Sequence, residues 1–206
     1  NANTYAGATL INAGTVLISN KDALGSATAG TGSSSTTIGV SGGTGATLRI
    51  IDANGGTPSL VVPEAITING TGAVTNAGAI RNTSGINYFT GNITIASAST
   101  IVSTGSSALE DSLVFRDGIM TLSNTLTVNT LRGTRFGNNI TNQITSTGGI
   151  TKTGTDTLVM QGNNNYTGIT NISAGAISLR NANGLGQGGA TANYNTVVTD
   201  GAALNI

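Results

Sequence analysis

Two segments of the chain, residues 3–25 and 164–186, are copies of one another set 161 positions apart. They share ten residues in 23 aligned positions, and at the start of the segment the identities fall on every second residue. These residues are Asn3, Tyr5, Gly7, Thr9, Ile11 and Ala13 in the first copy, and Asn164, Tyr166, Gly168, Thr170, Ile172 and Ala174 in the second. Because an extended strand sends alternate side chains to opposite faces, the pattern predicts β-strands in which one face has kept its residue types.

A glycine follows this alternation in both copies, and after it the alternation resumes one residue out of phase. We interpret Gly14 and Gly175 as corners between two strands. The whole chain holds 31 glycines and two prolines, which indicates many tight turns between short extended runs. No run of residues shows the three- and four-residue apolar spacing of a helix, so the sequence predicts an all-β fold.

Short apolar alternations recur along the chain at close intervals, separated by Gly, Asn or Ser. The clearest pairs are Leu48 and Ile50, Leu60 and Val62, Ile66 and Ile68, Ile93 and Ile95, Leu113 and Phe115, Met120 and Leu122, Leu126 and Val128, and Leu158 and Met160. Aromatic residues form only 3% of the chain, so we expect an interior built in narrow layers from Ile, Leu, Val and Ala.

The long repeat favours a solenoid over a closed sandwich, which has no reason to repeat a segment so far along the chain. The distance between the two copies divides into roughly eight turns of about 20 residues, a plausible size for one coil. The sequence therefore predicts a single parallel β-solenoid over residues 1–206, with about ten coils of roughly 20 residues. Stacked at the spacing of neighbouring strands, they would form a rod on the order of 50 Å long.

Charge and the missing residue types exclude several functions. Charged residues make up 8% of the chain, against about 25% in an ordinary globular domain. The eight basic residues are dispersed, so we expect no binding of nucleic acid. The chain has no cysteine and no histidine, which removes disulfides, the commonest zinc ligands and the commonest general base. No apolar run approaches the length that a helix needs to cross a bilayer, so no membrane span is expected.

Between Gly149 and Gly186, a lysine, several glycines, an Asn-x-Tyr motif and a final Leu-Gly follow in a fixed order. The residues are Gly149, Ile150, Lys152, Gly154, Thr157, Leu158, Met160, Gly162, Asn164, Tyr166, Thr167, Gly168, Thr170, Ile172, Gly175, Ile177, Leu179, Leu185 and Gly186. This order resembles the passenger-associated transport repeat, also called the autotransporter-associated β-strand repeat. Residues 3–25 resemble the second half of another copy. Asp156 replaces a glycine of the family pattern, and Asn165 and Ala6 replace threonines.

The resemblance implies a right-handed parallel β-helix from the secreted passenger of a large bacterial surface protein. In that family the repeat is considered architectural, helping the passenger leave the cell by progressive folding. It implies an extracellular or cell-surface location, with attachment to the outer membrane through flanking domains. The chain also opens inside one repeat copy and stops inside an apparent strand, so we expect it to be a piece of a longer protein.

Parallel β-helices also host polysaccharide lyases and hydrolases, which need carboxylates gathered on one face. The only acidic cluster is Glu110, Asp111 and Asp117, beside Arg116. We interpret it as a solvated loop in which Asp117 and Gly118 form the turn. Asp22, Asp52, Glu64, Asp156 and Asp200 are too scattered to assign. We therefore predict no catalytic residue and no enzyme activity.

Two apparent ligand-binding motifs are incomplete. The run from Gly42 to Gly45 begins like a calcium-binding nonapeptide, but Thr47 stands where the motif requires aspartate. Lys152 follows Thr151, not the glycine of a phosphate-binding loop. We therefore expect no metal and no cofactor. Asn163, Asn164 and Asn165, with Asn138 and Asn139, are candidates for corners, because asparagine tolerates left-handed backbone and can stack on an identical neighbour.

The leading hypothesis is a non-catalytic structural segment that serves as stalk, adhesin shaft or filament unit. A carbohydrate-binding or carbohydrate-active β-helix is an alternative, although the few tyrosines and phenylalanines are dispersed in the sequence. An ice-binding solenoid is a second alternative, but pairs such as Thr125 with Thr127 do not recur at a coil-length interval. As partners we expect neighbouring repeats of the parent protein or end-to-end copies of the chain, since terminal coils expose unpaired backbone, with host or surface glycans as further candidates.

Overall fold

The computed structural model describes residues 3–25, 35–40, 45–51, 60–75, 77–105, 112–137, 144–187 and 195–206. Within these ranges the chain forms 20 β-strands in a thirteen-stranded and a seven-stranded sheet. Every strand pairing in them is parallel. No helix in the described parts is long and apolar enough to cross a membrane. The all-β parallel solenoid expected from the sequence is confirmed.

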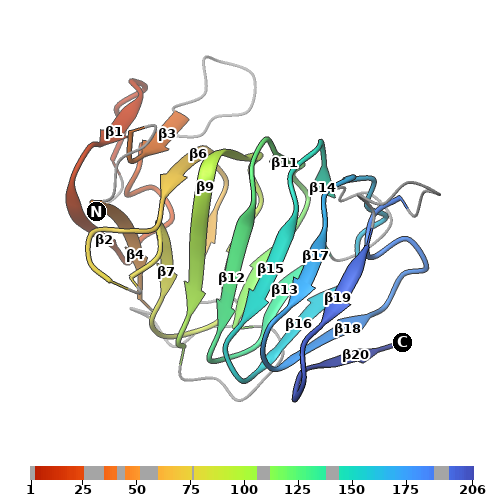
Figure 1. Ribbon diagram of the computed structural model, residues 1–206. Helices are drawn as coiled ribbons and strands as arrows, with labels where there is room; N and C mark the ends of the chain where they lie inside the picture. The colour runs from red at the N-terminus through yellow and green to blue at the C-terminus, as the bar shows by residue number, and fades with distance from the viewer. Residues whose placement is uncertain are drawn as a thin grey trace.

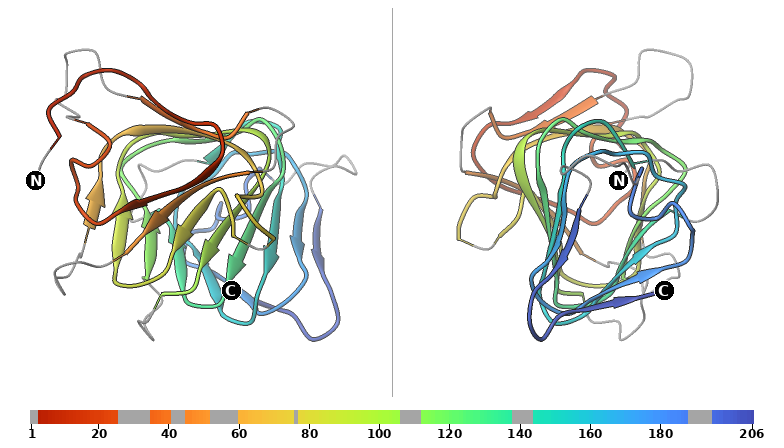
Figure 2. Two further views of the ribbon diagram at one scale, coloured as in Figure 1. Left: turned by 90° about the vertical axis from the view of Figure 1, so that its left-hand side faces the viewer. Right: turned by 45° about the vertical axis from the view of Figure 1, so that its right-hand side comes forward.

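The chain winds repeatedly past three columns of strands, so that each coil lies on the one before it (Figures 1 and 2). The first column contains β1 (Thr9–Ile11), β3 (Ser35–Ile38), β6 (Ala65–Gly70), the beginning of β9 (Ile93–Ser103), β11 (Met120–Leu122) and β14 (Ile144–Thr145). The second contains β2 (Gly14–Ile18), β4 (Ala46–Ile50), β7 (Ile80–Asn82), the end of β9, β12 (Leu126–Thr130), β15 (Ile150–Thr153), β17 (Thr170–Ile172) and β19 (Thr196–Val198).

The third column is the seven-stranded sheet. It contains β5 (Leu60–Val62), β8 (Asn87–Phe89), β10 (Leu113–Phe115), β13 (Thr134–Phe136), β16 (Thr157–Met160), β18 (Ala176–Leu179) and β20 (Ala203–Asn205). The long strand β9 runs through both the first and the second columns and thereby joins them into one sheet.

The coils are fewer and longer than the sequence analysis predicted. Registered partners lie between 19 positions apart, as in Leu158 and Ile177, and 32 positions apart, as in Gly14 and Ala46. The second column contains eight described strands, which corresponds to about eight coils in place of ten. Seven strand spacings give an axial length of about 34 Å, shorter than the predicted rod. The predicted coil length matches only the shortest coils, because the corner segments of the other coils are longer.

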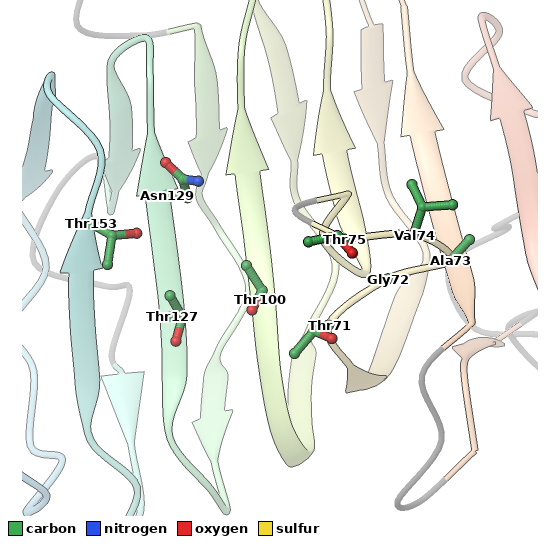
Figure 3. Close-up of a pocket in the computed structure, with 9 residues that line it drawn as sticks. All are labelled: Thr71, Gly72, Ala73, Val74, Thr75, Thr100, Thr127, Asn129 and Thr153. Atoms are coloured by element: carbon green, nitrogen blue, oxygen red, sulfur yellow. The ribbon is translucent and has the colours of Figure 1, made fainter.

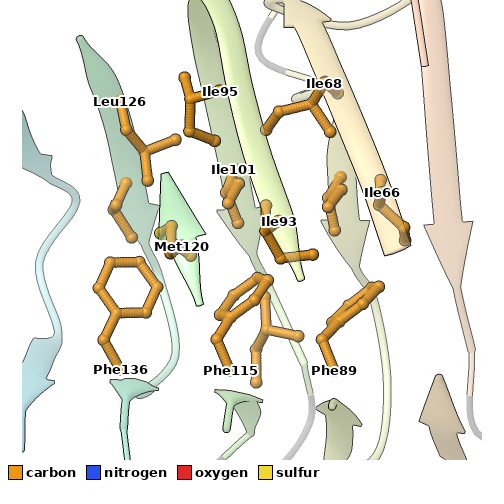
Figure 4. Close-up of a cluster of buried hydrophobic side chains, with 14 of the residues drawn as sticks. Ile66, Ile68, Phe89, Ile93, Ile95, Ile101, Phe115, Met120, Leu126 and Phe136 are labelled. Atoms are coloured by element: carbon orange, nitrogen blue, oxygen red, sulfur yellow. The ribbon is translucent and has the colours of Figure 1, made fainter. Parts of the chain in front are cut away.

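The interior is a closed apolar core. All eight alternating pairs predicted from the sequence lie in strands, and all sixteen side chains are buried. Isoleucine, leucine and valine dominate, as expected. Three phenylalanines, however, also line up inside the third column: the Phe89 and Phe115 rings stack 5.1 Å apart, and Phe136 meets Phe115 edge-on at 5.3 Å (Figure 4). The aromatic residues that look dispersed in the sequence thus include a continuous ladder.

A buried polar network lies at the corner between the second and third columns. Asn82 donates from Nδ2 to the carbonyl oxygen of Ser112 over 2.7 Å and accepts from Asn87 Nδ2 over 2.7 Å. The hydroxyls of Ser103 and Ser112 lie 3.1 Å apart, and in a later coil Thr130 donates to the carbonyl oxygen of Asp156. These side chains pair with backbone groups that leave the strand ladders where the coil turns, and so offset the cost of burying them.

Candidate functional site

In the second repeat copy, the Asn-x-Tyr motif forms a corner that holds three successive coils together. Asn164 is buried, and its Oδ1 accepts a hydrogen bond from the backbone N–H of Ile144 over 2.9 Å in the coil before it. Its Nδ2 donates to the carbonyl oxygen of Gly184 over 2.7 Å in the coil after it. Its neighbour Asn163 accepts from Asn183 Nδ2 over 2.9 Å, an asparagine ladder of the kind expected at such corners. Asn138 and Asn139, the other corner candidates, lie outside the described residues.

Tyr166 closes the same corner. Its side chain is 1% exposed, and its hydroxyl lies 2.6 Å from the hydroxyl of Thr170 at the start of β17. Burial raises the pKa of Tyr166 to about 12, although the hydrogen bond with Thr170 opposes the shift. The backbone of Tyr166 donates to Ile144 and accepts from Gln187. The hydroxyl therefore braces the corner within its own coil, while the backbone groups bond to the coils before and after it.

Lys152 points into the core. It lies between Val128 and Ile172 in the second column and is completely buried. Its Nζ donates to the carbonyl oxygens of Thr153 and Gly154, each over 2.8 Å, and to that of Ala174 in the next coil over 3.0 Å. Burial lowers the pKa of Lys152 to about 8, and the negative charge of Asp156 opposes this shift. The ammonium group thus binds carbonyl oxygens of two successive coils at the corner next to Gly175.

The first repeat copy reproduces the internal hydrogen bonds of the second. Asn3 Nδ2 donates to the carbonyl oxygen of Ala23 over 2.8 Å, as Asn164 does to Gly184. The hydroxyl of Tyr5 lies 2.5 Å from that of Thr9, as Tyr166 lies near Thr170. The corner glycines also agree, because Gly14 and Gly175 have φ values of 78° and 67°, in the left-handed region that favours glycine. The prediction that both glycines form corners is confirmed.

A model of the passenger-associated transport repeat matches residues 1–18 and 150–179, the segments that contain these two corners. The chain carries passenger-associated transport repeats. No curated protein and no solved structure matches the chain. The resemblance inferred from the order of lysine, glycines and Asn-x-Tyr is thereby confirmed, and the structure assigns each of these residue types a contact between coils.

The two transport repeats do not occupy the same face of the solenoid. β1 of the first repeat pairs with β3 in the first column, whereas the equivalent β17 of the second repeat pairs with β15 in the second column. The distance between them along the chain is therefore not a whole number of coils. From β2 to β17 the second column makes six steps, so the chain completes little more than six coils between the two copies in place of the eight that were assumed, which explains the wrong coil length.

The outer faces of the solenoid carry rows of threonine. Thr37, Thr67, Thr94, Thr121 and Thr145 are registered partners along the first column. Thr100, Thr127 and Thr151 continue a second row along the second column. Neither row is visible in the sequence, because the interval between successive threonines changes from coil to coil.

A groove of about 770 Å³ runs along the second column under the segment that connects β6 to β7 (Figure 3). Its lining residues are Thr71, Gly72, Ala73, Val74, Thr75, Thr100, Thr127, Asn129 and Thr153. The connecting segment forms one wall, and the threonines of β9, β12 and β15 form the floor. Hydroxyl and amide groups dominate its polar chemistry and no lining residue is charged, so the groove suits a neutral polar ligand.

The predicted acidic cluster is only partly described, because Glu110 and Asp111 lie outside the described residues. Asp117 is exposed, and Arg116 Nε lies 2.8 Å from Asp117 Oδ2. Asp117 has a φ of 68°, which fits the predicted turn with Gly118. The described parts of the chain contain no group of three or more acidic residues that could hold a metal ion. Thr47, which ended the incomplete calcium motif, is buried and donates to the carbonyl oxygen of Gly78.

Three of the scattered acidic residues have individual environments, while Asp52 lies outside the described ranges. Glu64 is 1% exposed, and both carboxylate oxygens lack a hydrogen-bond partner. Burial raises the pKa of Glu64, with a smaller opposing effect from its own backbone amide. Asp22 forms an exposed ion pair with Lys21 over 2.7 Å, and Asp156 accepts from the backbone N–H of Thr157. Nothing in the sequence around Glu64 distinguishes it from a surface residue, since it follows a proline between two strands.

Proposed function

We propose that the chain is a non-catalytic structural segment of a bacterial surface protein, the shaft of an autotransporter-like passenger displayed outside the cell. The observation that carries this proposal is the corner of the second repeat. Asn164, Tyr166 and Lys152 all use their polar groups in bonds that fix the corner and join successive coils, which leaves none of them available to a substrate. The repeat therefore joins one coil to the next, which is what a shaft requires.

A secretion assay tests the proposal. The chain is placed between a signal peptide and the β-barrel translocator of an autotransporter, and surface display is measured by protease accessibility on intact cells. We expect display of the unaltered chain and reduced display of Asn164→Ala, because the corner no longer stacks newly exported coils. Thr121→Ala, on the outer face, is the matched control and should be displayed normally. Retention of the unaltered chain inside the cell would contradict the proposal.

A second candidate function, carbohydrate binding, is favoured by the groove under the segment from Thr71 to Thr75. Its hydroxyls and the amide of Asn129 are groups that pair with sugar hydroxyls. A glycan array compares the unaltered chain with Thr127→Val in the groove and Thr121→Val on the adjacent face. Groove binding predicts loss of signal only for Thr127→Val, and equal signals from all three proteins would refute it.

A further inference from the structure

The first repeat copy presents the same corner as the second, but within the described residues no coil covers it. Tyr5 is 42% exposed although its equivalent Tyr166 is 1% exposed. Val16 is 37% exposed, whereas its equivalent Ile177 in β18 is fully buried. β1 pairs only with β3, and β2 only with β4, among the described strands, so each has a free edge on the same side. We call this surface, made by β1, β2 and Tyr5, the open face.

The glycines of the open face allow the backbone of a neighbouring coil to approach closely, as the equivalent glycines of the second copy do. A Cβ on Gly175 would lie 2.5 Å from the carbonyl oxygens of Gly154 and Asp156 and 2.8 Å from Lys152 Nζ. A Cβ on Gly168 would collide with the backbone of Gly148 and Gly149. At the equivalent Gly7 and Gly14, no described atom comes within 4 Å. Both positions therefore hold the residue that a neighbouring coil requires, with open space where that coil would lie.

Hydrogen-bonding groups of the open face are also unused. In the second copy, Asn164 Oδ1 and the backbone N–H of Tyr166 bond to Ile144, and the carbonyl oxygen of Ala174 accepts from Lys152. The equivalent groups are Asn3 Oδ1, the N–H of Tyr5 and the carbonyl oxygen of Ala13. In the described part of the chain none of these three groups has a hydrogen-bond partner.

We propose that the open face binds a further parallel β-coil whose lysine enters the core and bonds the carbonyl oxygen of Ala13. The chemistry required of this partner is that of residues 144–163 of the chain itself. By equivalence with β17 and β18, Lys152 of such a coil pairs with Ile11 and its Leu158 pairs with Val16. The inference depends only on coil geometry and holds whether or not the chain is displayed at a cell surface.

The chain's own last coil does not fit this role. In the second column the register runs from Lys152 through Ile172 to Val198. A second copy that stacked its last coil on the open face would place Val198 where the lysine is required, and the carbonyl oxygen of Ala13 would stay unpaired. The partner is therefore a coil with lysine at this position, in preference to the end of an identical chain.

A synthetic peptide of residues 144–163 with a fluorescent label tests the inference by titration against the whole chain. We expect saturable binding, at least tenfold weaker for the peptide with Lys152→Met. Binding should also protect Tyr5 from chemical nitration, read by mass spectrometry. In the chain, Gly7→Val blocks docking without disturbing the free fold, because the added side chain meets open space there.

Two results would overturn the inference. Equal binding of the lysine and methionine peptides, or no binding of either, removes the role of the lysine. Concentration-dependent association of the chain without peptide, abolished by Gly7→Val, would identify a second copy as the occupant. Folding of the Gly7→Val chain is checked by its thermal unfolding, which should match that of the unaltered chain.

Discussion

At the scale of single residues, Lys152 and Glu64 are buried in the described part of the solenoid but stand in opposite situations. Lys152 is buried but donates to three carbonyl oxygens, whereas Glu64 is buried and its carboxylate has no hydrogen-bond partner. Hydrogen bonds offset part of the cost of burying a charge, and removing the charge then leaves its partners unpaired, whereas a buried charge without partners bears the full cost. The two residues should therefore respond oppositely to neutral substitution at pH 7.

Replacing Lys152 by methionine is expected to lower the unfolding free energy by about 2 kcal/mol at pH 7, because three carbonyl oxygens lose their donor. The pH dependence of the unfolding free energy separates the loss of these hydrogen bonds from a change in packing. The folded-state pKa of about 8 lies below the ordinary value of 10.5, so between these values the unfolded chain binds more protons than the folded chain. Stability of the unaltered chain should rise with pH across this window relative to Lys152→Met. Denaturant unfolding of both proteins at pH 7, 8 and 10 measures the loss of stability and its pH dependence. An identical pH dependence of the two unfolding free energies would contradict the lowered pKa of Lys152.

Glu64→Gln should have the opposite effect. Because burial raises the pKa of Glu64 above 4.5, the folded chain binds the proton more tightly, and stability from this group is lost as pH rises above the unfolded value. Glutamine keeps the shape without the charge, so we expect a gain of about 1 kcal/mol at pH 7 and little change at pH 4. Urea midpoints at the two pH values test this, with Asp200→Asn, an exposed site, as control. A loss of stability at pH 7 would show that Glu64 has a favourable partner.

At the scale of strands and corners, the sequence predicted where the strands lie but not which strands lie side by side. Alternation located the buried pairs because period two is a property of a single strand. The phenylalanine ladder and the threonine rows depend on which strands lie side by side, and the corner segments that set this register vary in length. The buried position of Lys152 was missed for a related reason, since a lysine among polar residues looks solvent-exposed until the neighbouring coil supplies an acceptor.

The two asparagine corners provide a matched comparison at this scale. Asn164→Ala removes bonds to Ile144 and Gly184 in a buried corner and should lower the unfolding free energy by about 2 to 3 kcal/mol. Asn3→Ala removes one exposed bond to Ala23 and should have a much smaller effect on stability. Thermal unfolding of the two variants measures the difference. Equal losses would mean that Asn164 does not act by bridging coils.

The phenylalanine ladder gives a second test. Phe115 contacts rings on both sides, so Phe115→Ala should destabilise the chain by about 3 to 5 kcal/mol through lost burial and a cavity. Val61→Ala, at a half-buried position of the nearby strand β5, serves as control and should cost much less. Comparable destabilisation by both variants would show that the rings do not form a packed column.

At the scale of the whole molecule, the coils are long and few, so the body is shorter and wider than a rod of ten small coils. The parallel solenoid itself was predictable, because the repeat and the composition leave few alternatives. The number of coils was not, because the corner segments vary in length and the distance between the two repeats does not reveal how many coils it contains. The overall shape of the molecule is consequently a weak test of the parallel solenoid, whereas the distances between defined coils are a strong test.

The most direct measurement is the spacing of spin labels along the first column, which the absence of native cysteine makes straightforward. Leu10, Thr37, Thr67, Thr94, Thr121 and Thr145 follow one another as registered partners on its outer face. Labels at Leu10 paired with Thr94, Thr121 or Thr145 should lie about 14, 19 and 24 Å apart between backbones, a constant step of about 4.8 Å per coil. Distances that fail to grow by one strand spacing from each pair to the next would contradict the parallel solenoid.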